Sequence, residues 1–188
     1  MFLRNESFLN AMLIEAGCSG LSVAECDTRP FGRLPRVPSF AKSDFFTRRL
    51  SPSAIAALVG GIHRVSGIGG TAGGVGAVAF DALGGAVNKV KPDATAFVHR
   101  NALFLAQYST SWRFPGTSAG VARQHLWLRS FYAALHPHAS GEAYQNYVDP
   151  DLANWRQAYY AANYPRLQAV KAKYDPTGLF RFPQGITA

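Results

Sequence analysis

The spacing of apolar residues predicts two helices in the N-terminal third of the chain. Within residues 6–16 apolar side chains recur three and four positions apart, and Gly17 and Gly20 then end the pattern. Ser51 followed by Pro52 is typical of a helix start, and the stretch that follows has a helical period. Its predicted apolar face consists of Ile55, Leu58, Val59 and Ile62.

Four stretches rich in β-branched and aromatic residues predict short strands. They cover residues 39–50, 75–83, 94–100 and 103–112, and turn-forming glycine and proline residues separate the last three. Because these three follow one another along the chain, we expect antiparallel pairing.

A glycine tract precedes the second of these strands. Gly67, Gly69 and Ala72 match the order G-x-G-x-x-A of the dinucleotide-binding fingerprint. That fingerprint requires a strand before it and a helix start after it, so that backbone N–H groups face the pyrophosphate. Here a predicted helix precedes the tract and more glycine follows, so we favour a flexible or tightly turning loop.

The C-terminal half alternates predicted helices with one extended segment. Residues 117–135 form an amphipathic helix that Pro137 ends, and residues 143–149 are extended. Two further helices lie within residues 151–176, with a break at residues 163–165. The apolar face of the first helix consists of Val121, Leu126, Phe131 and Leu135. The mixed order, without a repeat or a linker, predicts one α+β domain in which helices cover one face of a mainly antiparallel sheet.

Composition and charge limit the partners. The chain has 188 residues, of which 48% are hydrophobic and 16% charged, which is enough for a buried core. Apolar runs fall short of the roughly 18 residues that cross a bilayer, and the first residues lack the pattern of an export signal, so we expect no membrane partner and, by default, a cytoplasmic location. The net charge of +8 suggests phosphate binding, but the basic residues are scattered. We expect a solvated basic surface and no nucleic-acid partner.

The cysteines and histidines form no recognisable metal-binding pattern. Cys18 and Cys26 have seven residues between them and no matching Cys or His pair. A local disulfide remains open, and two free thiols are the interpretation that we favour. We therefore expect no metal site.

The last part of the chain resembles the C-terminal end of the berberine-bridge-enzyme-like FAD-linked oxidoreductases of the vanillyl-alcohol-oxidase superfamily. The family pattern is Y-x-N-Y-x-D, then W with a YY pair, N-x-x-RL, VK, YDP, F and Q-x-I. The matching residues are Tyr144, Asn146, Tyr147, Asp149, Trp155, Tyr159, Tyr160, Asn163, Arg166, Leu167, Val170, Lys171, Tyr174, Asp175, Pro176, Phe180, Gln184 and Ile186. Landmarks upstream extend the resemblance over roughly residues 10–187.

The resemblance implies a partial enzyme. Residues 1–142 correspond to part of the substrate-binding domain and residues 143–188 to the berberine-bridge-like C-terminal segment, whereas the family's FAD-binding domain is absent. The implied cofactor is FAD. The implied partners are an FAD-binding domain or companion chain, a small-molecule substrate, and O₂ or another electron acceptor.

The resemblance also implies roles for the Y-x-N-Y motif. Tyr147 corresponds to a general base above the flavin, and Tyr144 and Asn146 to residues beside the cofactor. In an extended segment Tyr144 and Tyr147 would point to opposite sides. A phenol with a reference pKa of about 10 needs a nearby cation, such as Arg100 or the flavin itself, to act as a base. The alternative is that both tyrosines are amphipathic residues at the edge of the core.

Two further residues are candidates for substrate contact. By the resemblance, Gln107 is a polar residue on a strand that faces the substrate. His99 either contacts substrate or, as we favour, makes buried structural hydrogen bonds. The family places a second tyrosine where this chain has Leu83, so the resemblance does not support a two-tyrosine mechanism.

The expected function is that of the substrate-domain part of an FAD-dependent oxidoreductase that oxidises an alcohol, a sugar or a secondary metabolite. In the complete enzyme a base takes a proton while hydride passes to the flavin. The alternatives are a non-catalytic remnant or interaction fragment, and a basic nucleic-acid-binding module.

Overall fold

The computed structural model describes residues 5–30, 32–34, 37–65, 75–112 and 116–188. The chain divides into two compact units, Met1–Val37 and Pro38–Ala188. This differs from the single domain without a linker that the sequence predicted. The predicted glycine loop and its G-x-G-x-x-A match lie outside the described residues.

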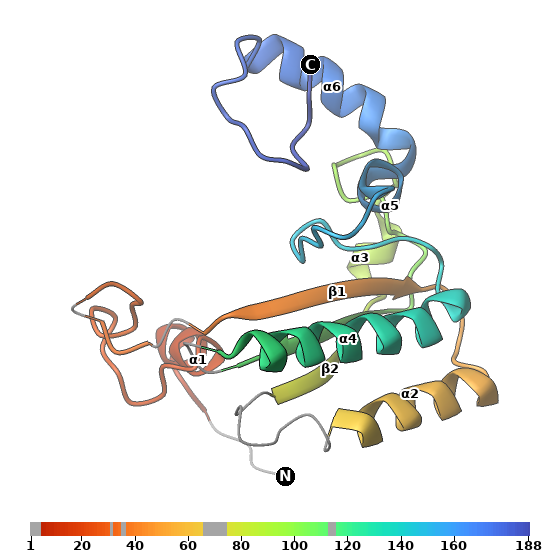
Figure 1. Ribbon diagram of the computed structural model, residues 1–188. Coiled ribbons are helices and arrows are strands. Elements are labelled where there is room, and N and C mark those ends of the chain that lie inside the picture. The colour runs from red at the N-terminus through yellow and green to blue at the C-terminus, as the bar shows by residue number, and fades with distance from the viewer. Residues whose placement is uncertain (1–4, 31, 35–36, 66–74, 113–115) are drawn as a thin grey trace. The chain divides into compact units, whose positions relative to one another are not determined.

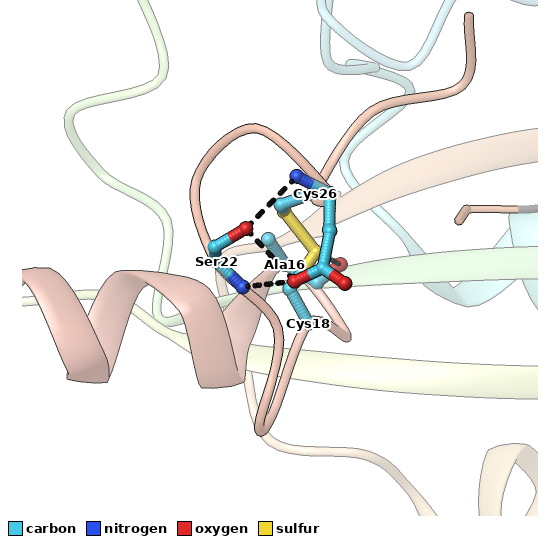
Figure 2. Close-up of a disulfide and its surroundings, with 5 residues drawn as sticks. Ala16, Cys18, Ser22 and Cys26 are labelled. Carbon is cyan, nitrogen blue, oxygen red and sulfur yellow. Dashed lines mark hydrogen bonds between the residues drawn. A yellow bond between two sulfur atoms is a disulfide. The ribbon is translucent and has the colours of Figure 1, made fainter. Parts of the chain in front are cut away.

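The first unit contains helix α1 (Phe8–Glu15) and a loop closed by a disulfide. Ser7 caps the helix, because its Oγ accepts a hydrogen bond from the Asn10 N–H. Cys18 and Cys26 are bonded to each other, with Cα atoms 5.6 Å apart, as Figure 2 shows. The favoured interpretation of two free thiols is therefore wrong. The loop turns tightly enough to bring the two residues together, which their spacing alone does not reveal.

Inside this loop Ser22 and Glu25 bond reciprocally. The Glu25 carboxylate accepts from the Ser22 N–H at 2.9 Å and from the Ser22 hydroxyl at 2.8 Å, while Ser22 Oγ accepts from the Glu25 N–H at 3.3 Å (Figure 2). These hydrogen bonds lower the pKa of the Glu25 carboxyl group, and the bond from the Ser22 backbone N–H contributes most. The disulfide loop is thus also held by local hydrogen bonds.

The second unit is built on a three-stranded antiparallel sheet with the order β1-β3-β2. The strands are β1 (Ser39–Phe46), β2 (Val75–Ala82) and β3 (Phe104–Ser111). Gln107 lies in the middle strand, opposite Ser43 of β1 and Ala79 of β2. The α+β prediction is confirmed.

The predicted strand at residues 94–100 does not form; residues 94–96 are a bend, residues 97–99 have no regular secondary structure, and Arg100 lies in a turn. Backbone carbonyl groups in this segment and just before it accept hydrogen bonds from side chains and not from a neighbouring strand. Asn163 Nδ2 donates to the carbonyls of Pro92 and Thr95, and Arg100 Nε donates to that of Phe97. The apolar pattern of this segment therefore reflects burial and not pairing.

Helices α2 (Pro52–Val65) and α4 (Ser118–Leu135) pack on the same face of the sheet (Figure 1). The helices approach closely where Gly61 faces the Phe131 ring, since a Cβ at Gly61 would lie 2.3 Å from that ring. The Trp127 indole N–H also donates to the Gly61 carbonyl at 3.0 Å. The buried core consists of Phe46, Ala54, Ala106, Tyr108, Trp127, Leu128, Phe131 and Leu135.

The close approach shifts the buried face of α2, on which Leu58 is the one residue of the predicted face that packs against the core. Ala54 and Gly61 are buried, whereas the larger Ile55, Val59 and Ile62 are exposed. On α4, Phe131 and Leu135 are buried as predicted, but Leu126 is 65% exposed. Small residues let two helices approach, and a search for large apolar residues selects the wrong side of such a helix.

The C-terminal part is helical and broken as predicted. A single 3₁₀ turn (His136–His138) follows α4, and α5 (Trp155–Tyr160) and α6 (Tyr164–Tyr174) are separated by a 3₁₀ turn at Ala161–Asn163. Its small core consists of Ala143, Trp155, Ala158 and Tyr159. The short helix α3 (Ala86–Lys89) follows β2. Among the described residues, no helix is long and apolar enough to cross a membrane.

A buried carboxylate links the sheet to the end of α4. Asp44 is fully buried, its Oδ1 lies 2.7 Å from His136 Nδ1, and its Oδ2 accepts from the Tyr108 hydroxyl at 3.1 Å. Burial raises the pKa of Asp44, and the hydrogen bond to Asp44 raises the pKa of His136. The hydrogen bond between Asp44 and His136 therefore couples the titrations of the two side chains.

Replacing His136 by Gln should remove a pH-dependent part of the stability. Because the His136 pKa is raised on folding, its contribution is present below the unfolded value of about 6.5 and is lost as pH rises through the folded pKa. Urea unfolding from pH 5 to pH 9 should show a loss in His136→Gln that shrinks as pH rises. The matched control is His138→Gln in the same 3₁₀ turn, and the same pH dependence in both variants would contradict the assignment.

Candidate functional site

The predicted site residues gather on the sheet face opposite α2 and α4. Side chains alternate along a strand, so Phe45 and Leu105 face away from the helices that cover Phe46 and Ala106. They form, with Ala102, a second buried cluster that we call the outer cluster. Its partly buried members are Leu83, Phe97, Tyr144 and Tyr147.

The Y-x-N-Y motif is a turn and not an extended segment. The Tyr147 N–H donates to the Tyr144 carbonyl at 2.9 Å, and the two rings meet edge to face with centroids 5.1 Å apart. The predicted opposite orientation of the two tyrosines is therefore wrong. A turn with this hydrogen bond brings its first and fourth residues together, and both rings pack on the outer cluster.

The two amide side chains of the turn, Asn146 and Gln145, differ in exposure and in partners. Asn146 is exposed, and its Nδ2 donates to Tyr144 Oη at 2.8 Å. Gln145 Oε1 is buried and accepts no hydrogen bond from the described residues. The turn thus combines two phenols, an exposed amide and an unsatisfied acceptor.

The described surroundings keep Tyr147 protonated. Burial raises its pKa, and the negative charge of Asp81 adds to the effect. The guanidinium of Arg100, a candidate cation, donates to the carbonyls of Phe97 and Val87 and to the Thr95 hydroxyl. If Tyr147 is to act as a base, a group other than Arg100 must therefore stabilise its phenolate.

His99 lies beneath the turn, with 1% of its surface exposed. Its Nδ1 is 3.1 Å from Glu142 Oε2, and its ring stacks on Phe45 with centroids 4.0 Å apart. Its Nε2 has no partner among the described residues. This burial supports the structural interpretation over direct contact with substrate.

Gln107 occupies the centre of the outer face. It is partly exposed, and Leu105 on the same side of β3 is buried in the outer cluster. Leu83, which stands where the family has a second tyrosine, is a member of that cluster. A substrate contact by Gln107 stays a prediction.

Sequence reasoning missed three residues around the turn. Ser43 Oγ accepts from the Tyr144 N–H at 2.9 Å, Lys42 pairs with Asp149, and Asp81 acts on Tyr147 by its charge. Alternation along β1 could have placed Ser43 on the outer face beside Phe45. No local signal connects Lys42 to a residue 107 positions away.

Known proteins resemble this chain both in the segment of the tyrosine turn and beyond it. The family described as berberine and berberine like matches residues 143–187, which contain the tyrosine turn. An uncharacterized FAD-linked oxidoreductase of Bacillus subtilis (strain 168), YgaK, is 42% identical over 106 residues, which are 56% of this chain and 22% of that protein. A chitooligosaccharide oxidase of Gibberella zeae is 36% identical over 116 residues, which are 57% of this chain and 23% of that protein.

A solved structure extends the likeness over almost the whole chain. The berberine-bridge-enzyme-like protein 1 of Physcomitrella patens superposes with a TM-score of 0.74 at 29% identity, covering 95% of this chain and 36% of that one. The chain is therefore a relative of FAD-linked oxidoreductases. More particularly, it is a relative of the berberine-bridge-enzyme-like group, as its C-terminal motif predicted. It spans between 22% and 36% of the length of these three proteins.

Proposed function

We propose that the chain is the substrate-domain part of an FAD-dependent oxidoreductase in which Tyr147 is the general base. The observation that carries the proposal is the tyrosine turn, which packs on the outer face of the sheet and lies within the matched family segment. The substrate would be an alcohol, a sugar or a secondary metabolite. Its hydroxyl proton passes to Tyr147 Oη while its C–H hydride leaves. FAD, when bound, would supply the hydride acceptor, with O₂ or another acceptor oxidising it afterwards.

The residues of the turn fit the ring portion of FAD. The ring edge of a flavin carries N–H donors and carbonyl acceptors, and Gln145 Oε1 and the exposed Asn146 amide offer the complementary groups. Tyr144, which holds the Asn146 amide, would complete this contact. The turn from Tyr144 to Tyr147 contains no cation for a pyrophosphate, so the phosphates would be held by an FAD-binding domain or companion chain.

Proton transfer requires a change in the environment of Tyr147. Burial and the charge of Asp81 favour its neutral form in this chain. A hydrogen-bond donor or positive charge brought against its hydroxyl would favour the phenolate. We therefore expect the base to become active only in the complete enzyme, where such a group faces the outer cluster.

The isolated chain should purify without flavin. It offers contacts for a ring edge but none in the turn for the phosphates, and most of the affinity for a dinucleotide comes from both ends together. The measurement is the ratio of flavin absorbance at 450 nm to protein. A ratio near one per chain would contradict the expectation.

A chimera tests whether the chain supports FAD binding and substrate oxidation when the rest of an oxidase is present. In it, the chain replaces the matching portion of the chitooligosaccharide oxidase from Gibberella zeae, to which it is 36% identical over 116 residues. We expect the chimera to bind FAD and to release H₂O₂ with chitooligosaccharides or another sugar. A folded chimera that binds FAD but is reduced by no alcohol or sugar would instead support the non-catalytic alternative.

A further inference from the structure

A buried ion pair lies close to the tyrosine turn. Lys42 and Asp149 are 6% and 5% exposed, and Lys42 Nζ lies 2.7 Å from Asp149 Oδ2. The ammonium is also 3.5 Å from Asp151 Oδ2 and 5.2 Å from the centre of the Tyr132 ring. Burying two charges costs desolvation energy that their attraction often fails to exceed, so such a pair is weak evidence of a stabilising role. Fixing a unique geometry is the better-attested use of buried polar pairs.

Every other polar group of Asp149 is also bonded. Its Oδ1 accepts from the Asp151 N–H at 2.9 Å, its N–H donates to the Tyr159 hydroxyl at 3.0 Å, and its carbonyl accepts from Gln184 Nε2 at 2.7 Å. Asp149 thereby joins β1, α5 and the C-terminal tail. The residue lies only two positions after Tyr147.

Neighbouring residues of β1 hold the two ends of the turn. Ser43 points to the outer face and accepts from the Tyr144 N–H at 2.9 Å. Lys42 points to the helix-covered face and binds Asp149. β1 is an edge strand, so the segment from Tyr144 to Asp149 passes from one face of the sheet to the other around this edge. The Tyr147 ring lies on the outer face, between the two anchors.

We propose that the Lys42–Asp149 pair is a positioning device that fixes the far end of the tyrosine turn and so holds the Tyr147 ring against the outer cluster. The positioning follows from the contacts of this chain alone. Its bearing on catalysis rests on the proposed function. Lys42 and Asp149 act through Tyr147 and are positioning residues.

The test removes both charges and follows the two ends of the turn separately. Lys42→Met combined with Asp149→Asn removes both charges of the pair, so that Asp149 is not left as a buried charge without its cation. Amide hydrogen exchange, measured by NMR on the full chain, should accelerate by about tenfold or more at Tyr147 and Asp149 and stay unchanged at Tyr144, which Ser43 still holds. A general loss of stability would accelerate all three.

A second readout follows the side chain itself. Tyrosine labelled with ¹³C at Cζ gives one resonance for each of the eight tyrosines, and Tyr147→Phe identifies that of Tyr147. Because burial is the main cause of its raised pKa, release of the ring should move its titration down toward the usual value of about 10. Lys171→Met, which breaks the ion pair between Lys171 of α6 and Asp175 just after that helix, is the matched control and should leave this titration unchanged.

The outcomes separate this proposal from the proposed function. Unchanged exchange and titration in a folded double variant would overturn the positioning role. If the double variant does not fold, Asp149→Asn alone weakens the pair while Asp151 still faces Lys42, and it should accelerate exchange at Tyr147 more than at Tyr144; equal exchange at these two amides would also overturn the role. Neither readout requires flavin, so a failure of Tyr147 as a base in the chimera would leave the positioning result intact.

Discussion

Replacing Tyr147 by Phe in the chimera should lower the rate of flavin reduction by roughly 10²–10⁴-fold, the scale of general-base catalysis. The change removes one oxygen and keeps the ring that packs on the outer cluster, so the fold and the FAD content should not change. Rapid mixing of anaerobic chimera with chitooligosaccharide, followed by flavin bleaching at 450 nm, gives the rate directly. The effect should appear in the limiting rate at saturating substrate.

Two other tyrosines provide controls. Tyr160 is half-buried among Tyr159 and Tyr164, away from the turn, and Tyr160→Phe should leave reduction unchanged. Tyr144→Phe should have an intermediate effect, because the Tyr144 hydroxyl orients Asn146 and its ring contacts Tyr147. Near-normal reduction in Tyr147→Phe, or an equal loss in Tyr160→Phe, would mean that another group is the base.

Local sequence signals predicted the elements of the fold better than their packing. The capping Ser51, Pro52 and the break before Pro165 gave the helix limits, because each acts within one or two turns of the backbone. The buried residues of α2 could be read only in part in this way, because Leu58 packs on the core but Ile55, Val59 and Ile62 are exposed. The buried face depends on Gly61 meeting Phe131, which lies on another helix, 70 positions further along the chain.

The site shows the same division between local motif and tertiary contact. The motif identified Tyr144 and Tyr147, but their orientation depends on a hydrogen bond that turns the backbone, and the residue types permit an extended segment equally well. The burial that we favoured for His99 is found, but nothing near it in the sequence indicated its contact with Glu142, 43 positions away. The anchors of the turn come from β1, about a hundred positions away, and only the fold brings them together.

Truncating Phe131 to Ala should destabilise the chain by about 3–5 kcal/mol, the largest effect that we expect of a single substitution in the core. The ring is fully buried, packs edge to face on Tyr108 with centroids 5.4 Å apart, and lies 5.4 Å from the Trp127 ring. Its loss leaves a cavity between α2, α4 and the sheet. Urea unfolding followed by circular dichroism measures the change.

A reciprocal variant tests whether the ring and Gly61 fit each other. Gly61→Ala would place a Cβ 2.3 Å from the Phe131 ring and should destabilise by about 1–3 kcal/mol, although Ala favours a helix by about 1 kcal/mol. The matched control is Gly60→Ala, whose Cβ would meet only Arg64 Nη1 at 3.5 Å and which should be neutral or stabilising. In a Phe131→Leu background the cost of Gly61→Ala should largely disappear, because the shorter side chain leaves room. Additive effects of the two changes would show that the helices move apart in response, and that this contact does not set their distance.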